Sequence, residues 1–117
     1  MSYPAVYNMD APQGQTLNRV LTWKIDGTPV NITGFSARMM VRPTASAASI
    51  YLSLTSNTGG GLTLGGALGT ITVYATAAQM AAVPAGQHAY DLELVSGSGE
   101  VTRLIGGKFN VSAEVTR

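Results

Sequence analysis

The amino-acid sequence predicts an all-β fold, a sandwich of about seven strands with one short helix. Between turn residues the apolar side chains recur at every second position, which is the pattern of strands with one buried face. The 14 glycines and 5 prolines interrupt the chain often, so that turn signals recur about every 8–12 residues, as in a β-sandwich. The 117 residues, 45% of them hydrophobic, suffice for one core. We therefore expect a single domain over residues 1–117.

Two strands with clear alternation are expected first. Residues 17–26 alternate apolar and polar side chains, except that Arg19 lies on the apolar side, and Asp26-Gly27-Thr28-Pro29 then supplies turn residues. Residues 35–42 alternate in the same way and end before Pro43, which cannot donate to a ladder. In this second strand the side chains expected to point inward are Phe35, Ala37, Met39 and Val41, and those expected to point outward are Ser36, Arg38, Met40 and Arg42.

The rest of the chain predicts further strands, one loop and one helix. Three successive glycines make residues 56–61 an exposed loop. Thr76 and Gln79 have the spacing of a capping box, which predicts a short crossover helix over residues 76–83. The double glycine Gly106-Gly107 predicts a bulge or a bend in the last strand. Strands are expected at residues 50–54, 62–64, 69–74, 87–95 and 101–115, the last two joined by a hairpin turn at residues 96–99.

The charge content is low, because 11% of the residues are Asp, Glu, Lys or Arg against about 25% in an average soluble domain. A surface of Ser, Thr, Asn and Gly favours a subunit that packs against neighbours, although many small β domains are simply rich in Thr and Ser. The net charge of +1 argues against nucleic acid and anionic membranes as partners. The first ten residues have neither the basic region nor the apolar run of a secretion signal.

The residues that carry most enzyme chemistry are scarce. Cysteine is absent and His88 is the only histidine, so the sequence predicts no catalytic, cofactor-binding or metal-ligating residues and no enzyme. We expect His88 to be a partly buried or edge residue. Asp91 and Glu93 lie on the same face of a predicted strand, and we expect them on a solvated face, paired with Arg38 and Arg42 of another strand.

Three stretches of this sequence are similar to a known family. They are residues 26–42, residues 81–86 leading into Tyr90-Asp91-Leu92-Glu93-Leu94, and residues 107–117. They resemble the immunoglobulin-like module found at the N-terminus of phage upper baseplate proteins and as small stand-alone virion proteins of phages and prophages. The resemblance implies an immunoglobulin-like β-sandwich without catalytic residues, located in the virion and, during assembly, in the host cytoplasm. Asn31 and Phe35 depart from the family's usual Asp and Tyr.

Five residues are expected to define this fold. Gly34 supplies the bend at which the chain steps between sheets, next to Phe35. Trp23 is expected between the sheets as an anchor. Tyr90 resembles the tyrosine corner of immunoglobulin-like sandwiches, and Leu92 stands where many such domains have cysteine.

Contacts with other proteins are expected at sheet edges and at two loops, residues 45–49 and 56–61. An open sandwich leaves unpaired backbone groups on its outer strands, and an uncharged edge does little to repel a partner. The predicted interface residues are Arg38, Met40, Arg42, Ser56, Asn57, Thr58, Gly59 and Gly60.

The sequence is compatible with three functions. The first is a tail or baseplate protein that forms a symmetric homo-oligomeric ring or adaptor and joins larger virion components. The second is a cement protein that decorates the head. The third is a carbohydrate-binding module, with Tyr3, Tyr7, Tyr51 and Tyr74 as aromatics able to face a sugar, although they are scattered along the sequence rather than arranged in a stripe.

Overall fold

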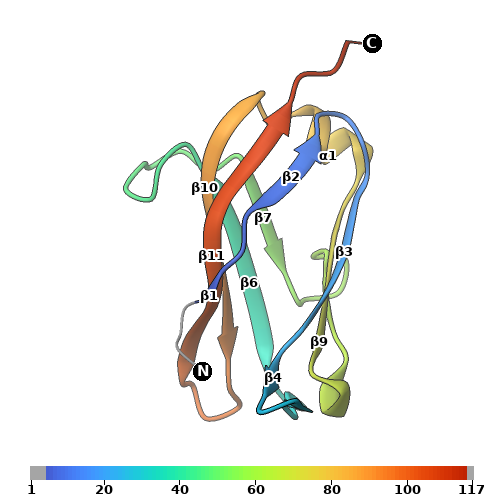
Figure 1. Ribbon diagram of the computed structural model, residues 1–117, viewed down its shortest axis with the longest axis vertical. Coiled ribbons are helices and arrows are strands. Elements are labelled where there is room, and N and C mark those ends of the chain that lie inside the picture. Colours follow the sequence, from blue (N-terminus) through green and yellow to red (C-terminus); the bar gives the residue numbers. More distant parts are fainter. Residues whose placement is uncertain (1–4, 116–117) are drawn as a thin grey trace.

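The computed structural model describes residues 5–115, which form two packed β-sheets (Figure 1). Sheet A has the order β1-β11-β10-β6-β7, with β2 also paired to β11, and sheet B has the order β3-β9-β8. The bounds of the sheet A strands are β1 Ala5–Val6, β2 Met9–Pro12, β6 Ser36–Arg42, β7 Leu52–Thr55, β10 Gly86–Val95 and β11 Val101–Ser112. Those of the other elements are β3 Leu17–Thr22, β4 Lys24–Ile25, β5 Thr28–Pro29, β8 Leu62–Leu64, η1 Gly66–Leu68, β9 Thr70–Ala75 and α1 Ala77–Ala81.

The strand order is that of an immunoglobulin-like sandwich. One sheet holds β6, β10 and β11, with β7 added beside β6, as in the variable type of this fold. The other sheet holds β3, β9 and β8. The fold class expected from the sequence is therefore confirmed, with more and shorter strands than the seven predicted.

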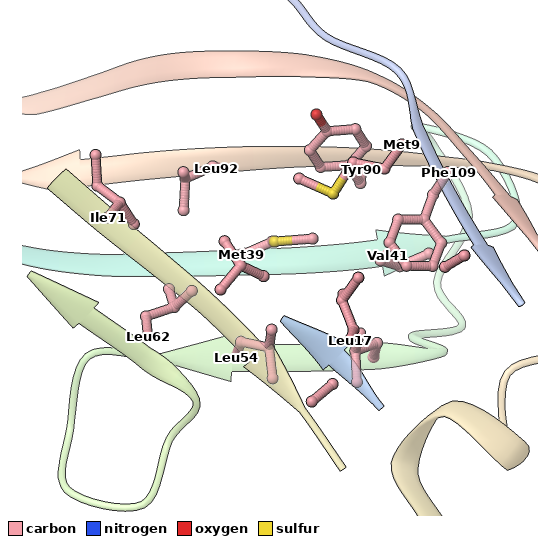
Figure 2. Close-up of a cluster of buried hydrophobic side chains, with 14 of the residues drawn as sticks. Met9, Leu17, Met39, Val41, Leu54, Leu62, Ile71, Tyr90, Leu92 and Phe109 are labelled. Carbon is pink, nitrogen blue, oxygen red and sulfur yellow. The ribbon is translucent and has the colours of Figure 1, made fainter. Parts of the chain in front are cut away.

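The alternation of side chains predicts β6 and β9 correctly because each strand has one buried face. It also predicts β3, although the strand expected over residues 17–26 ends at Thr22 and is followed only by the short β4. In β6 the inward residues Ala37, Met39 and Val41 are buried, and Met39 lies opposite Leu92 of β10 and Leu54 of β7. The core also includes Ile71 of β9 and other inward residues of sheet B, and Figure 2 shows Met39 among side chains from both sheets. Leu92 is fully buried, as expected of a core position.

Two aromatic residues differ from their expected places. Trp23 is only partly buried and packs against the side of the core. Phe109 is instead the largest fully buried side chain, and it lies with Met9 and Tyr90 at one end of the cluster (Figure 2). Tyr90 and Phe109 pack edge to face with their ring centroids 6.1 Å apart. The expectation that Trp23 anchors the space between the sheets is thus wrong.

The turn and the step between sheets form as predicted. Asp26 and Gly27 both have positive φ, 51° and 79°, which is the conformation of a two-residue hairpin turn between β4 and β5. Gly34 has φ of 83° at the bend that leads from a segment bonded to Gly66, beside sheet B, into β6 of sheet A. Phe35 is partly buried and packs against the core just after this bend.

The predicted helix is present as α1, a single short helix between β9 and β10. The Thr76 side chain accepts from the Gln79 N–H at 3.1 Å, and the Gln79 side chain accepts from the Thr76 N–H at 2.8 Å. This is the capping box that the spacing predicts. The Met80 side chain fixes the helix against the sandwich, since it is fully buried.

The alternation of side chains does not predict the strands β1 and β2. Both run parallel to β11 at the edge of sheet A, where Ala5 lies opposite Ile105 and Met9 opposite Phe109 (Figure 1). Between them the Asn8 side chain accepts from the Lys108 N–H at 2.9 Å and keeps the two short strands in line with β11.

The double glycine has a different role from the predicted bulge. Leu92 pairs with Ile105 and Glu93 with Arg103, so the extra residue of the bulge is Leu104. Gly107 instead permits a close approach, because a Cβ atom there would lie 2.7 Å from Asn8 Oδ1 and 2.9 Å from the Tyr7 carbonyl oxygen. The last strand also ends at Ser112, before the predicted residue 115.

Candidate functional site

Within the part of the chain that the structure describes, the titratable side chains form no cluster that could hold a metal ion. The side chain of His88 is buried, its Nε2 lies 2.6 Å from the Pro84 carbonyl oxygen, and its ring packs edge-on against Tyr51 at 4.8 Å. His88 is thus a structural residue that ties the end of the α1 turn to β10.

The carboxylates Asp91 and Glu93 lie on the outer face of sheet A. Glu93 forms an ion pair with Arg38 at 2.7 Å, as the sequence predicts. Asp91 lies 4.0 Å from Arg103 of β11, while Arg42 instead donates to the carbonyl oxygens of residues 47 and 48. Burial raises the pKa of Asp91 above its usual range, and the neighbouring Glu93 charge adds to the rise.

The outer face of sheet A carries three of the predicted interface residues. Arg38, Met40 and Arg42 point outward from β6, in rows with the outward residues of β10. A hollow of about 530 Å³ lies on this face, which we call the sheet A hollow. It is lined by Val6, Met40, Arg42, Ala45, Ala89, Tyr90, Asp91, Arg103, Gly106 and Gly107.

The outer face of sheet B carries no charged side chain in the part that the structure describes. Its outward residues lie in register across the three strands: Asn18 opposite Tyr74, Val20 opposite Thr72 and Thr63 beyond it, and Thr22 opposite Thr70. We call these seven residues the neutral face. Sequence alternation gives which residues of each strand point outward, but only the register brings Asn18 beside Tyr74.

The loop after β7 rises beside the neutral face and forms a second hollow with it, of about 750 Å³, the sheet B hollow. Four of the predicted interface residues line this hollow, namely Ser56, Asn57, Thr58 and Gly59. Gly60 does not line it. Gly60 instead holds the loop, because its carbonyl accepts from the Thr55 N–H at 2.9 Å and a Cβ atom there would overlap Thr55. The structure therefore separates the predicted interface into two surfaces on opposite sheets.

The strand β3 is the longest open edge of sheet B. Trp23 N–H donates to the Gly69 carbonyl oxygen, and this register with β9 makes alternate residues of β3 bond to β9. Asn18, Val20 and Thr22 therefore direct their backbone N–H and C=O groups away from the sheet. Within residues 5–115 these outward groups have no strand partner.

Arg19 is the one charged residue of β3, and its charge does not lie at this open edge, where it would repel a second strand. Its guanidinium points inward across the side of the sandwich and donates to the Asp10 carbonyl oxygen and the Tyr7 hydroxyl. The sequence signal for this contact is that Arg19 is the single charged residue among the alternate, otherwise apolar positions of residues 17–26. Arg19 thereby bonds the Asp10 carbonyl of β2, and β3 has no charged side chain on its outer face.

The other sheet edges are shorter or occupied. Thr55 at the end of β7 bonds Gly60, and β8 has three residues. The edge beside β1 and β2 is held by Tyr90, whose hydroxyl donates to the Tyr7 carbonyl oxygen. Burial raises the pKa of this Tyr90 hydroxyl above its ordinary value. Because Tyr90 bonds the N-terminal segment and not the backbone a few residues upstream, the resemblance to a tyrosine corner is wrong.

No family model matches the chain, and a search of the curated proteins finds no match. Among solved structures the chain is similar to the extracellular domains of the voltage-gated sodium channel beta4 subunit, which form parallel homodimers that explain that protein's role in cell-cell adhesion. The sequence identity is 11%, the TM-score is 0.44, and the match covers 98% of each chain. Among residues 5–115 no helix has the length and apolar character needed to cross a bilayer.

Proposed function

We propose that this chain is a non-enzymatic structural subunit of a bacteriophage virion, in the tail or baseplate. It pairs with a second copy of itself through β3, and the resulting homo-oligomer joins larger virion components. The proposal rests on the open, uncharged edge of β3, together with the three stretches of sequence that resemble phage immunoglobulin-like modules.

The edge of β3 is suited to pairing with its own copy. Soluble proteins usually protect exposed strand edges with charges, prolines or bulges, and the outward residues Asn18, Val20 and Thr22 provide none of these. An antiparallel pair about a two-fold axis at Val20 places Val20 opposite its own copy and Asn18 opposite Thr22. No like charges meet in this arrangement, and the two copies of sheet B form one continuous sheet.

The exposed side chain of Val20 supports the proposal that a second copy covers β3. Its side chain is 63% exposed, although β-branched apolar side chains stabilise sheets mainly through cross-strand neighbours. Pairing at β3 gives each Val20 a cross-strand partner. The outer face of sheet A, with cations and carboxylates side by side, then remains available for other virion proteins.

A substitution at Val20 tests the pairing. In Val20→Lys two ammonium groups would meet across the axis, so the protein is expected to become monomeric by sedimentation velocity while its circular-dichroism spectrum stays unchanged. Val101→Lys is the matched control, because Val101 is also exposed, at 52%, but lies on sheet A. A wild-type protein that is monomeric at 100 μM would contradict pairing through β3.

The place in the virion is tested separately, by quantitative mass spectrometry of purified phage particles. A location in the tail or baseplate predicts a small number of copies per particle, in a multiple set by the tail symmetry. Hundreds of copies would indicate a cement protein on the head instead. Absence from purified particles would refute the virion assignment without bearing on the β3 pair.

A further inference from the structure

We infer that the sheet B hollow is a binding site for a neutral oligosaccharide, with the ring of Tyr74 as the surface on which a sugar stacks. This inference goes beyond the proposed function, because it concerns side chains on the face of sheet B, whereas the pairing uses the backbone groups at the edge of β3. It rests on the composition of the hollow, the exposure of one aromatic ring and the polar groups left unpaired around it.

The hollow combines hydroxyl and amide side chains with no charge at all. A sugar presents hydroxyl groups that both donate and accept, and side-chain amides and hydroxyls can do the same. The fourteen lining residues are Asn18, Phe35, Ser56, Asn57, Thr58, Gly59, Gly61, Leu62, Thr63, Leu64, Thr72, Tyr74, Thr76 and Gln79.

Tyr74 is the aromatic residue that faces this hollow most openly. Its side chain is 44% exposed, on β9, where Asn18 lies directly opposite on β3. The C–H groups on one face of a pyranose ring are apolar, and they pack on an aromatic face as other apolar groups do. The Tyr74 ring can thus pack on the face of a sugar ring, while the Asn18 amide bonds hydroxyl groups at the edge of the same sugar.

Several polar groups around Tyr74 are unpaired within the described part of the chain. The side-chain amides of Asn18 and Asn57 and the Tyr74 hydroxyl make no hydrogen bond within residues 5–115. The capping box uses the Gln79 side-chain oxygen, and it leaves the Gln79 Nε2 amide without a partner in the same residues. These groups are donors and acceptors available to a ligand.

The walls of the hollow are held in place before any ligand binds. Tyr74 N–H donates to the Gly61 carbonyl oxygen at 2.8 Å, and Gly60 N–H donates to the Asn57 carbonyl oxygen at 2.7 Å. The loop therefore keeps its distance from Tyr74, and a ligand does not have to order it.

The chemistry of the hollow argues against other ligand classes. An anionic ligand finds no cation among the lining residues, in contrast to the sheet A hollow, where Arg42 and Arg103 lie. A wholly apolar ligand would leave the hydroxyl and amide groups unpaired, which costs free energy.

The test is titration of ¹⁵N-labelled protein with maltohexaose, cellohexaose, laminarihexaose, xylohexaose and chitohexaose, followed by two-dimensional NMR. At least one of these is expected to shift the side-chain amide signals of Asn18, Asn57 and Gln79. Tyr74→Ala should weaken that binding about 10-fold, the effect of losing an aromatic contact. Tyr74→Phe, which retains the ring, should stay within about threefold of the wild type.

Two controls make the outcome decisive. Val101→Ala changes an exposed side chain of sheet A, outside the hollow, and should leave the affinity unchanged, and a heparin tetrasaccharide tests an anionic sugar. The inference is overturned if none of the five neutral hexasaccharides shifts these amide signals at 10 mM. It is equally overturned if Tyr74→Ala binds like the wild type, or if the shifts map to the sheet A hollow.

Discussion

Single side chains close the side of the sandwich where the N-terminal strands lie. Tyr90 and Arg19 come from different sheets, and both donate to the segment around Tyr7 and Asp10. Met9 then fills the core beside Phe109. The attachment of this segment therefore combines the pairing of β1 and β2 with β11, these side-chain hydrogen bonds and the burial of Met9 and Ala11.

Removal of the Tyr90 hydroxyl tests this attachment. Tyr90→Phe keeps the ring in the core but loses the bond to the Tyr7 carbonyl oxygen, so the free energy of unfolding should fall by about 1 kcal/mol in urea titrations. Tyr74→Phe is the control, since its exposed hydroxyl has no partner within residues 5–115 and its loss should change stability by less than about 0.5 kcal/mol. Equal effects of the two variants would show that the Tyr90 bond contributes nothing.

Asp91 gives a prediction about pH. Because burial raises the pKa of Asp91 in the folded chain, the folded state binds this proton more tightly than the unfolded state does. The contribution of Asp91 to stability is therefore lost as pH rises from the ordinary carboxyl pKa through the raised value. Asp91→Asn should increase the free energy of unfolding relative to the wild type more at pH 7 than at pH 3.

The control for this pH dependence is Asp26→Asn, because Asp26 is exposed at the hairpin turn. The effect of Asp26→Asn on the free energy of unfolding should not be more stabilising at pH 7 than at pH 3. If Asp91→Asn lowers stability more at pH 7 than at pH 3, the ion pair with Arg103 outweighs the cost of burial and the expected sign is wrong.

At the scale of elements, the alternation of side chains predicts those strands that have one solvent-exposed face and one buried face. It also gives the outward positions of Arg38, Met40 and Arg42. It misses β1 and β2, because they are short, end at Pro12 and pair in parallel with a strand about a hundred residues away. Local sequence carries no information about such a partner.

The same limit applies to the candidate site. The loop at residues 56–61 can be predicted from its glycines, and Tyr74 from its place in a strand. Their meeting in one hollow depends on the registers of β8 and β9 and on the bond between Tyr74 and Gly61. The positions of the aromatic residues in the sequence therefore do not predict which of them faces a polar hollow.

The crossing of the N-terminal segment over β11 gives a prediction at this scale. Gly107→Ala should lower the free energy of unfolding by about 1–3 kcal/mol, because the added methyl overlaps Asn8 and the Tyr7 carbonyl. Gly106→Ala is the matched control, since its nearest atom lies at 3.4 Å, an ordinary contact distance. Thermal unfolding of both variants measures the difference, and a Gly106→Ala that is as unstable as Gly107→Ala would contradict this account.

At the scale of the whole molecule, the charges are unevenly distributed. The outer face of sheet A carries Arg38, Arg42, Asp91, Glu93 and Arg103, while the neutral face of sheet B carries none. The two faces are thus suited to different contacts: the first to partners with charges in register, and the second to neutral ligands at its centre and a like strand at its edge.

Pairing through β3 makes stability depend on protein concentration. Binding between folded copies stabilises the folded state by mass action, so Tm should rise between 5 μM and 500 μM for the wild type. Differential scanning calorimetry of Val20→Lys should give the same Tm at both concentrations. A wild-type Tm that does not change with concentration would contradict the pair.

The parallel pairing of β2 with β11 also has a consequence for synthesis of the chain. Asn8 and Lys108 bond across 100 residues, so the first strands leave the ribosome long before their partner has been translated. Until β11 emerges, Met9 has no Phe109 to pack against. The growing polypeptide then carries an unpaired, partly apolar segment at β1 and β2. The contacts of β1 and β2 therefore form only after β11 has left the ribosome, and chaperone binding to the nascent chain should be strongest before that point.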